Sequence, residues 1–354
     1  MLHQGVISRT EHENTQFVSS LFTRPKKDDS LRPIINLKIL NQFIPYQKFK
    51  MESLDHVHSL IRKGDFMIKL DIKNAFWSVP IHPDSQRFLK FCWDKKLYKF
   101  MVLPFGIGPA SRIFTKLMKI PISLLRKLSI RVVVYLDDIL IIAKLSQIGT
   151  SRDTSIFLLE SLGLPINYIK SSLTASQICE FLGMIINSRE MTITLPVAKA
   201  QKIIDLCRNT LNSPFTSPRK LSSLIGTLYA TTPAIPHAAI QLRHLQGDLI
   251  QNLRSTSWES RINLSPQAKA EIKWWIENIL LVRGNPIHLG PPDLNLRSDA
   301  ASKGAWGGHV VGGTETGGQW SPMERDLHIN ILELLAAEGI HLFTPNVEQT
   351  PNCS

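Results

Sequence analysis

The chain of 354 residues has a formal net charge of +12, with 43% hydrophobic and 8% aromatic residues. This length favours two or three domains, and the apolar content excludes global disorder. The positive charge favours a polyanionic partner, although many basic proteins bind nothing specific.

Cysteine spacing and hydropathy exclude further classes of protein. The four cysteines lie far apart and form no C-x-x-C pair, so they predict neither a disulfide framework nor a zinc site. The polar N-terminus lacks the apolar segment of a signal peptide. The longest apolar run, Val132 to Ala143, is interrupted by two aspartates and is too short to cross a bilayer. We therefore expect a soluble, intracellular protein with no membrane partner, either cytoplasmic or nuclear.

The first part of the chain predicts an arm followed by strands. Residues 1–16 are expected to form a loose N-terminal arm. From residue 17 to residue 41, short apolar runs flank the polar turn PKKDDS, a pattern typical of a β-hairpin. The segment FMIKLDI at 66–72 is β-branched and aromatic, and predicts a strand.

A basic segment follows this strand. Between Gln86 and Arg131, eleven lysines and arginines accompany a single acidic residue, Asp94. Such a segment attracts phosphates, with binding that weakens as salt rises. The alternative is a solvated helical face. Within the segment, residues 110–128 carry apolar side chains at helical spacing and predict a helix.

Two further strand regions come next. Residues 131–143 contain the apolar runs VVVYL and ILIIA, split by two aspartates, which predicts a strand, a tight turn and a second strand. Residues 181–186 predict another short strand, opened by the dipeptide Leu182-Gly183.

The C-terminal half begins with helices and ends in a second α/β pattern. Residues 196–282 have a helical pattern with two polar breaks. Three prolines and two glycines within 283–292 predict a linker. From residue 294 onward we expect a strand, a glycine-rich stretch and a helix that begins near Asn330.

Three aspartates lie where apolar strands end. Asp71 closes the strand predicted at 66–72, and Asp137 and Asp138 form the tip of the predicted hairpin. Charged groups in such strands are costly to bury unless something compensates them, and clustered carboxylates select Mg²⁺ or Mn²⁺. Two such ions about 3.5–4 Å apart activate a hydroxyl and stabilise a leaving pyrophosphate. The alternative for the aspartate pair is a simple turn, because aspartate tolerates turn backbone angles.

Five segments resemble, in chain order, the polymerase motifs of reverse transcriptases: PKKDDSLRPIINLKILN, FMIKLDIKNAF, LPFGIGPASRIF, YLDD and FLG. The resemblance covers residues 17–183 and continues more weakly to the C-terminus. LPFG, YLDD and a ribonuclease-H-like segment after them are most similar to LTR-type retroelements, and among these to the tyrosine-recombinase (DIRS-like) group.

The resemblance implies an α/β fold with an α+β palm, namely a right-hand polymerase with fingers, palm and a helical thumb. The implied domains are an arm at 1–16, fingers and palm at 17–188, a helical thumb and connection at 189–290, and a partial ribonuclease-H-like domain at 291–354.

The same resemblance assigns roles to individual residues. Asp71 and Asp137 would hold two Mg²⁺ or Mn²⁺ ions, with Asp138 as the third carboxylate. Phe76 matches the residue whose ring blocks a 2′-hydroxyl and so favours deoxynucleotides; the alternative is an ordinary core phenylalanine. The other matches are Lys26 (or Lys27) and Arg32 for the triphosphate, Phe105 and Gly106 for the sugar and base, and Phe181, Leu182 and Gly183 for the primer grip. A structural strand and turn is the alternative for the last triplet.

The C-terminal segment LRSDAASKGAWGGHV resembles the first strand of ribonuclease H. Asp299 and, on the following helix, Glu333 match two of its carboxylates; surface residues are the alternative. Hydrolysis in that fold uses about four carboxylates around two metals. The last aspartate of the chain as written is Asp326, so we expect ribonuclease H activity to be absent.

The implied function is RNA-directed DNA synthesis, in which deoxynucleoside triphosphates extend a primer on an RNA or DNA template. Two alternatives remain open. One is a catalytically dead retroelement relic that still binds nucleic acid. The other is an RNA-dependent RNA polymerase, against which Phe76 argues, because an RNA polymerase needs room for the 2′-hydroxyl. The sequence does not predict the oligomeric state.

Overall fold

The computed structural model describes residues 1–25, 31–254, 257–282, 284–287, 295–302, 304–311 and 313–343. The chain divides into two compact units, Met1–Ile287 and His288–Ser354. Each unit has its own hydrophobic core, so each is described by itself. No helix among the described residues is long and apolar enough to span a membrane.

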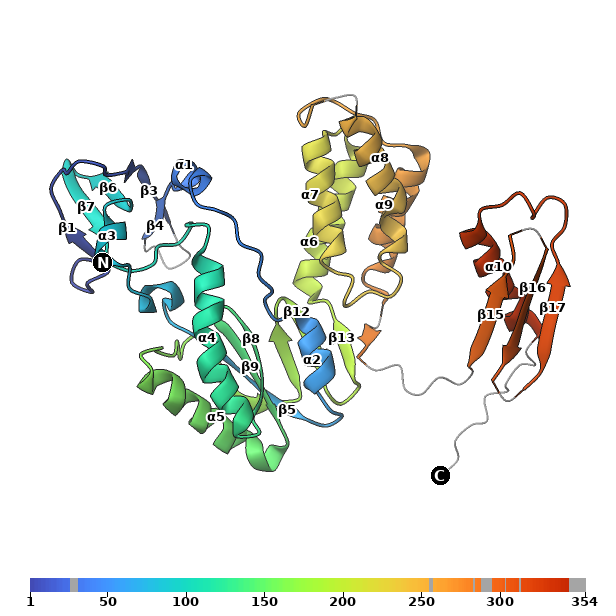
Figure 1. Ribbon diagram of the computed structural model, residues 1–354, viewed down its shortest axis with the longest axis horizontal. Helices are drawn as coiled ribbons and strands as arrows, with labels where there is room; N and C mark the ends of the chain where they lie inside the picture. The colour runs from blue at the N-terminus through green and yellow to red at the C-terminus, as the bar shows by residue number, and fades with distance from the viewer. Residues whose placement is uncertain are drawn as a thin grey trace. The chain divides into compact units, whose positions relative to one another are not determined.

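The N-terminal sheet and an adjacent hairpin open the larger unit (Figure 1). The sheet has the order β1-β7-β6-β2, built from β1 (Ile7–Arg9), β2 (Val18–Ser19), β6 (Lys90–Trp93) and β7 (Lys96–Phe100). The predicted hairpin is present as β3 (Leu21–Pro25) and β4 (Leu31–Ile35), and its tip at 26–30 lies outside the described residues. Two short helices accompany them, α1 (Lys38–Gln42) and α3 (Pro83–Gln86).

The expectation of a loose N-terminal arm is wrong. Strand β1 pairs antiparallel with β7. The fully buried Lys90 donates hydrogen bonds to the carbonyl of Glu11 and to Gln16, and its Nζ lies 2.7 Å from a carboxylate oxygen of Glu13. The hydrogen bond from Lys90 holds the pKa of Glu13 below its usual value. The arm is therefore held in place, because its polar groups supply the hydrogen bonds and the counter-charge that the buried Lys90 ammonium group needs.

The central sheet, called the palm sheet below, has the order β10-β5-β9-β8. Its strands are β5 (Phe66–Asp71), β8 (Arg131–Tyr135), β9 (Asp138–Ala143) and β10 (Ser172–Ser176). Helices α4 (Ala110–Lys127) and α5 (Leu145–Ser161) cover one face of it (Figure 1). The strands predicted at 66–72 and 131–143 and the helix predicted at 110–128 are confirmed to within a residue or two.

Both faces of the palm sheet are buried, which explains the nearly continuous apolar runs of its strands. Alternate residues of a strand face opposite sides. Ile68 and Ile141 pack against α4 and α5, whereas Met67 and Leu140 belong to the core on the other face. That second core also contains the helices that follow.

A third sheet has the order β11-β12-β13-β14. Its strands are β11 (Ile178–Phe181), β12 (Met184–Asn187), β13 (Thr192–Thr194) and β14 (Asn285–Pro286). The single strand predicted at 181–186 is wrong, because Leu182 and Gly183 form a turn between β11 and β12. Their φ angles are 51° and 70°, and two central residues with positive φ are typical of a two-residue hairpin turn.

The predicted helical region at 196–282 is confirmed. It contains α6 (Val197–Asn212), α7 (Pro218–Tyr229), α8 (Arg243–Leu253) and α9 (Pro266–Asn278), and α2 (Leu54–Leu60) packs into the same core. Two of these helices begin at a Ser-Pro pair: the hydroxyls of Ser217 and Ser265 accept hydrogen bonds from backbone amides of the first turn. The predicted linker is wrong in its first part, since β14 pairs with β13 and Ile287 is buried.

The described residues of the smaller unit form an antiparallel sheet and one helix. Its elements are β15 (Leu296–Ala300), β16 (Ala305–Val310), β17 (Glu315–Gln319) and α10 (Ile329–Phe343). Its core includes Ala300, Trp320, Leu332 and Ala336. The predicted strand, glycine-rich stretch and helix are therefore confirmed.

Candidate active site

Three aspartates lie together at one end of the palm sheet. Asp71 is the last residue of β5 and Asp138 the first of β9, and they are opposite each other in the antiparallel register. Asp137 lies in the turn between β8 and β9, where Leu136 has a φ of 54°. The amide of Ile72 donates a hydrogen bond of 2.9 Å to the carbonyl of Asp137 and so ties the turn to β5.

The backbone of Asp71 is fixed from a second side. Its amide donates to the Oγ of Ser171 at 3.0 Å, and its carbonyl accepts from the amide of Asn167 at 2.7 Å. The Ser171 hydroxyl in turn donates to the Asn167 carbonyl at 2.8 Å. These bonds hold the end of β5 in place, and Asp71 is only 9% exposed.

The carboxylates repel one another. Asp137 is exposed as a residue, yet the protein atoms around it remove part of its hydration. This partial burial raises the pKa of Asp137, as do the negative charges of Asp138 and Asp71, whereas a backbone hydrogen bond and Lys170 act in the opposite direction. One charge is balanced within the protein, because Lys69 Nζ lies 2.8 Å from Asp138 Oδ1. A cation bound between the carboxylates would lower their mutual repulsion.

The donor set fits a hard divalent cation in part. Carboxylate oxygens are the ligands that Mg²⁺ and Mn²⁺ prefer. Within the described ranges, no group of three His, Cys, Asp or Glu side chains is arranged to hold a metal by itself. Mg²⁺ at phosphate-processing sites is commonly held by one or two carboxylates plus substrate phosphates. Asp71 and Asp137 fit that arrangement, while Asp138 is already paired with Lys69.

Phe76 lies on the short 3₁₀ helix η1 (Ala75–Ser78), directly after β5. Its ring centroid is 5.0 Å from that of Phe105 and 5.7 Å from that of Phe114. Phe114 is fully buried, whereas Phe105 is 56% exposed. Phe76 therefore packs on the core on one side and is covered by an exposed aromatic ring on the other.

The loop that carries Phe105 is held by a residue that the sequence analysis missed. Asn41, on α1, donates a hydrogen bond of 2.9 Å to the Gly106 carbonyl and accepts one of 2.7 Å from the Gly108 amide. Gly106 has a φ of 95°, which favours glycine. Asn41 is part of the segment resembling the fingers motif, but no local spacing marks it as a loop anchor.

The structure describes only part of the predicted triphosphate-binding residues. Lys26 and Lys27 fall outside the described residues. Arg32 lies on β4, opposite Arg24, and its side chain is outside the described part of the chain. The triphosphate contact of these residues stays a prediction.

The predicted primer-grip residues occupy the β11–β12 hairpin. Phe181 is fully buried, so its side chain serves the core. The turn residues Leu182 and Gly183 are partly exposed, and the Gly183 carbonyl accepts a hydrogen bond of 3.1 Å from Lys199 Nζ. The turn, rather than the phenylalanine, is the part available to a ligand.

The basic segment divides into structural and exposed charges. Lys90 is buried, Arg126 pairs with Glu52, and Arg131 pairs with Asp65. The exposed members are Lys95, Lys96, Lys116, Lys119, Arg126 and Lys127. The alternative of a solvated helical face thus fails for Lys90 and Arg131, which lie on strands and are largely shielded from water.

In the smaller unit the two candidate carboxylates lie on different elements. Asp299 is exposed on β15, opposite Gly307 in the register, and lines a shallow pocket of about 640 Å³ formed by residues of the three strands and the loop after β15. Glu333 is partly buried on α10 and is not among the residues that line this pocket. Their role in hydrolysis stays a prediction.

Comparisons with known proteins agree with this geometry. Residues 24–186 match the family model described as reverse transcriptase (RNA-dependent DNA polymerase). The genome polyprotein of Petunia vein clearing virus is 28% identical over 179 residues, 49% of this chain and 8% of that protein. The Pro-Pol polyprotein of simian foamy virus type 1 is 27% identical over 240 residues, 67% of this chain and 19% of that protein. The Tf2-3 transposon polyprotein of Schizosaccharomyces pombe is 25% identical over 169 residues, 48% of this chain and 12% of that protein. The chain thus spans less than a fifth of each relative.

Solved structures show the same fold. A foamy viral protease-reverse transcriptase in complex with double-stranded DNA has a TM-score of 0.68 at 19% identity, covering 97% of this chain and 59% of that one. The enzyme in complex with an RNA/DNA hybrid has a TM-score of 0.65 at 19% identity, covering 96% and 44%. The predicted polymerase fold is confirmed. Residues 24–186 therefore match the reverse transcriptase family, and the relatives of this part of the chain are retroelement and viral polyproteins.

Proposed function

We propose that this chain is an RNA-directed DNA polymerase that extends a primer with deoxynucleoside triphosphates. The observation that carries the proposal is the strand register that sets Asp71 opposite Asp138, with Asp137 in the adjoining turn. This carboxylate group lies inside the segment that matches the reverse transcriptase family.

The reaction requires charge neutralisation and positioning. The primer 3′-hydroxyl attacks the α-phosphorus, a new phosphodiester bond forms, and the bond to the leaving pyrophosphate breaks. Two bound Mg²⁺ or Mn²⁺ ions would activate the hydroxyl and stabilise the leaving group. Asp71 and Asp137 would hold them, since their backbones are fixed by the β5 end and the hairpin turn. Asp138 fits a supporting role, because Lys69 already balances its charge.

The aromatic residues beside the aspartates would select the sugar. Phe76 is backed by the buried Phe114 and cannot easily retreat from a 2′-hydroxyl. The exposed Phe105 would contact the nucleotide, with Gly106 allowing close approach of the backbone. Lys26 and Arg32 would hold the triphosphate, by resemblance.

The nucleic-acid partner is proposed to be an RNA or DNA template paired with a primer. Exposed lysines of the basic segment, such as Lys116 and Lys119 on α4, would contact backbone phosphates. Contacts to phosphates position a duplex without reading its sequence, as a polymerase requires. The Leu182-Gly183 turn would support the primer end.

Primer extension on poly(rA)/oligo(dT) with Mg²⁺ or Mn²⁺ tests the proposal. Wild type is expected to extend the primer, and Asp137→Asn to lose extension while keeping duplex binding. The matched control is Asp153→Asn, which removes an exposed carboxylate from α5 and should extend normally. Equal extension by Asp137→Asn and wild type would remove Asp137 from the reaction.

A second candidate is a protein that binds nucleic acid without turnover. It is favoured by one observation: Asp138 is paired with Lys69, so one of the three carboxylates is already neutralised within the protein. Salt-sensitive duplex binding with no extension in either metal would establish this candidate instead.

We further propose that the source is an LTR-type retroelement of the tyrosine-recombinase (DIRS-like) group. The motifs LPFG and YLDD, followed by a ribonuclease-H-like segment, support this assignment. A tyrosine recombinase reading frame in the same element would agree with it, and an integrase frame in its place would contradict it.

A further inference from the structure

Strand β8 is the outer strand of the palm sheet, with β9 on its inner side. An edge strand presents backbone N–H and C=O groups without a strand partner. Unpaired groups of this kind cost free energy when they are shielded from water. The end of β8 leads through Leu136 directly into Asp137, so the anchoring of this edge bears on the carboxylate group.

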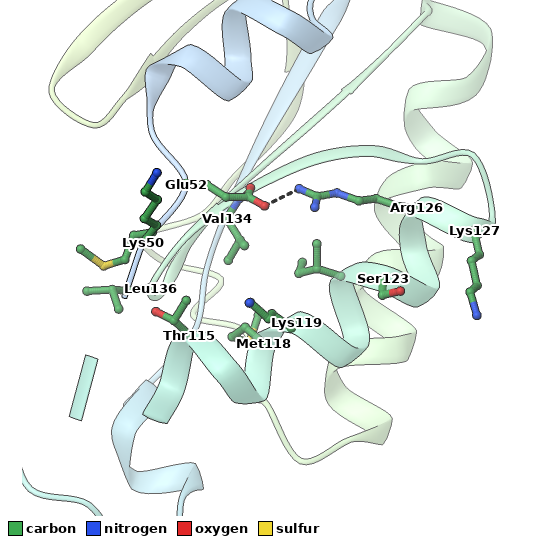
Figure 2. Close-up of a pocket in the computed structure, with 12 residues that line it drawn as sticks. Lys50, Glu52, Thr115, Met118, Lys119, Ser123, Arg126, Lys127, Val134 and Leu136 are labelled. Carbon is green, nitrogen blue, oxygen red and sulfur yellow. Dashed lines mark hydrogen bonds and ion pairs between the residues drawn. The ribbon is translucent and has the colours of Figure 1, made fainter. Parts of the chain in front are cut away.

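Two side chains take the place of a neighbouring strand at this edge. Glu52 Oε2 accepts a hydrogen bond of 2.8 Å from the Val134 amide. Arg126 Nη2 donates one of 2.8 Å to the Val132 carbonyl. The two side chains also pair with each other at 2.6 Å. Figure 2 shows Glu52 and Arg126 facing each other, with Val134 close to Glu52. This pair is called the edge clamp below.

The clamp joins parts of the chain that are distant in sequence. Glu52 immediately precedes Ser53, the residue that caps α2, and Arg126 lies in the last turn of α4. Both border a pocket of about 580 Å³, whose rim also carries Lys50, Lys119 and Lys127 (Figure 2). Glu52 is the one acidic residue among those lining this pocket, and its side chain is 18% exposed. The Arg126 side chain is 42% exposed, so the carboxylate is the better shielded half of the clamp.

A second ion pair anchors the opposite end of β8, which is farther from Asp137. Arg131, the first residue of the strand, pairs with the buried Asp65 and donates to the Leu60 carbonyl at 2.8 Å. It anchors the start of β8, six residues before Asp137. The edge clamp instead binds the Val132 carbonyl and the Val134 amide, and the Val134 bond lies three residues before Asp137.

We propose that Glu52 is a positioning residue for nucleotidyl transfer: with Arg126 it fixes the edge of β8 and thereby the position of Asp137. This inference rests on the proposed polymerase function. The fold does not depend on the clamp alone, because β8 is paired with β9 along its length and Val132 and Val133 are fully buried. Loss of the clamp should therefore loosen the turn more than it unfolds the sheet.

The test compares three variants of the full chain in primer extension. Glu52→Leu removes both the acceptor for Val134 and the partner of Arg126. Glu52→Gln keeps an oxygen that can accept from the Val134 amide but removes the charge. Asp153→Leu is the matched control, because it removes a carboxylate that also pairs with an arginine, Arg152, but that lies exposed on α5, away from β8.

We expect Glu52→Leu to lower kcat by about 10²-fold, since a displacement of about 1 Å at a reacting group costs that much. KM for the deoxynucleotide should stay within about twofold of wild type, because the clamp touches no part of the nucleotide site. Glu52→Gln should recover most of kcat, and Asp153→Leu should match wild type. Wild-type kcat in Glu52→Leu, or an equal loss in Asp153→Leu, would overturn the proposal.

Hydrogen exchange separates this inference from the polymerase proposal. In Glu52→Leu, backbone amides of residues 131–136 should exchange faster than in wild type, while those of β5 stay protected. Faster exchange throughout the unit would mean a general folding role and overturn the positioning role. A wild-type chain that never extends a primer would overturn the proposed function, and with it the positioning role; local exchange in Glu52→Leu would still show whether the clamp itself exists.

Discussion

The palm sheet and the sheet of the smaller unit both carry candidate carboxylates, but they hold them differently. In the palm sheet, Asp71 and Asp138 are opposite each other on paired strands that are buried on both faces. In the smaller unit, Asp299 is exposed and lies opposite Gly307, while Glu333 is on a helix. The comparison shows that strand register, rather than the motif alone, sets two carboxylates opposite each other.

The largest expected effect is the loss of primer extension when a carboxylate of the palm sheet, rather than one of the smaller unit, is removed. Asp71→Asn should lower primer extension by about 10³-fold, because metal-assisted charge stabilisation is worth several kcal/mol and each 1.36 kcal/mol is tenfold. Asp299→Asn should leave extension unchanged. Steady-state extension rates of both variants on the same template check the prediction. The affinity of each variant for the duplex is measured in parallel and should equal that of wild type. An equal loss in the two variants would abolish the distinction between the sheets.

The next effect concerns packing in the smaller unit. A Cβ at Gly308 would overlap the Ile340 side chain of α10 and the Arg297 carbonyl, whereas one at Gly307 would lie 3.9 Å from its nearest neighbour, the Thr316 carbonyl. Gly308→Ala should therefore destabilise this unit by about 1–3 kcal/mol, and Gly307→Ala should not.

Limited proteolysis of the full chain measures that effect, since cleavage within residues 296–343 follows local opening of the unit. Primer extension should be unchanged in both glycine variants, because the two units have separate cores. Loss of extension in Gly308→Ala alone would show that the smaller unit supports the polymerase site.

The sequence predicted the parts of the site that depend on local pattern. The β-branched runs on either side of Asp137-Asp138 specify two strands, and the aspartates specify the turn between them. The same kind of local pattern marks the Leu182-Gly183 turn, because a glycine that follows a run of strand residues is a turn signal.

Long-range contacts account for what the sequence could not predict. Glu52 bonds to a residue 82 positions away, and Asn41 to one 65 positions away. Strand β1 depends on β7 for its hydrogen bonds, and β14 depends on β13. None of these partners is marked by periodicity or spacing, because each depends on how separate elements pack together.

A moderate effect is expected at the sugar-binding position. Phe76→Val should raise ribonucleotide incorporation relative to deoxynucleotide incorporation by about 10- to 10²-fold, as loss of a steric contact of this size would. It should also cost about 2 kcal/mol of stability, because the ring packs against Phe114. Competition between the two nucleotide types on one template measures the selectivity. Phe91→Val is the control: this buried ring packs against Tyr98 and Phe100 of the N-terminal sheet, so its loss should lower stability at least as much without relaxing sugar selection.

The smallest expected effect follows from the raised pKa of Asp137. A carboxyl whose pKa is higher in the folded state than in the unfolded chain costs stability when ionised. That cost is present above the folded pKa and disappears as the pH falls toward the unfolded value of about 3.9. Asp137→Asn should therefore melt roughly 1 °C above wild type at neutral pH, a small difference because the residue is exposed. The difference should vanish below about pH 4, and a constant difference across pH would mean that the raised pKa, caused by partial burial and by the charges of Asp138 and Asp71, is not its origin.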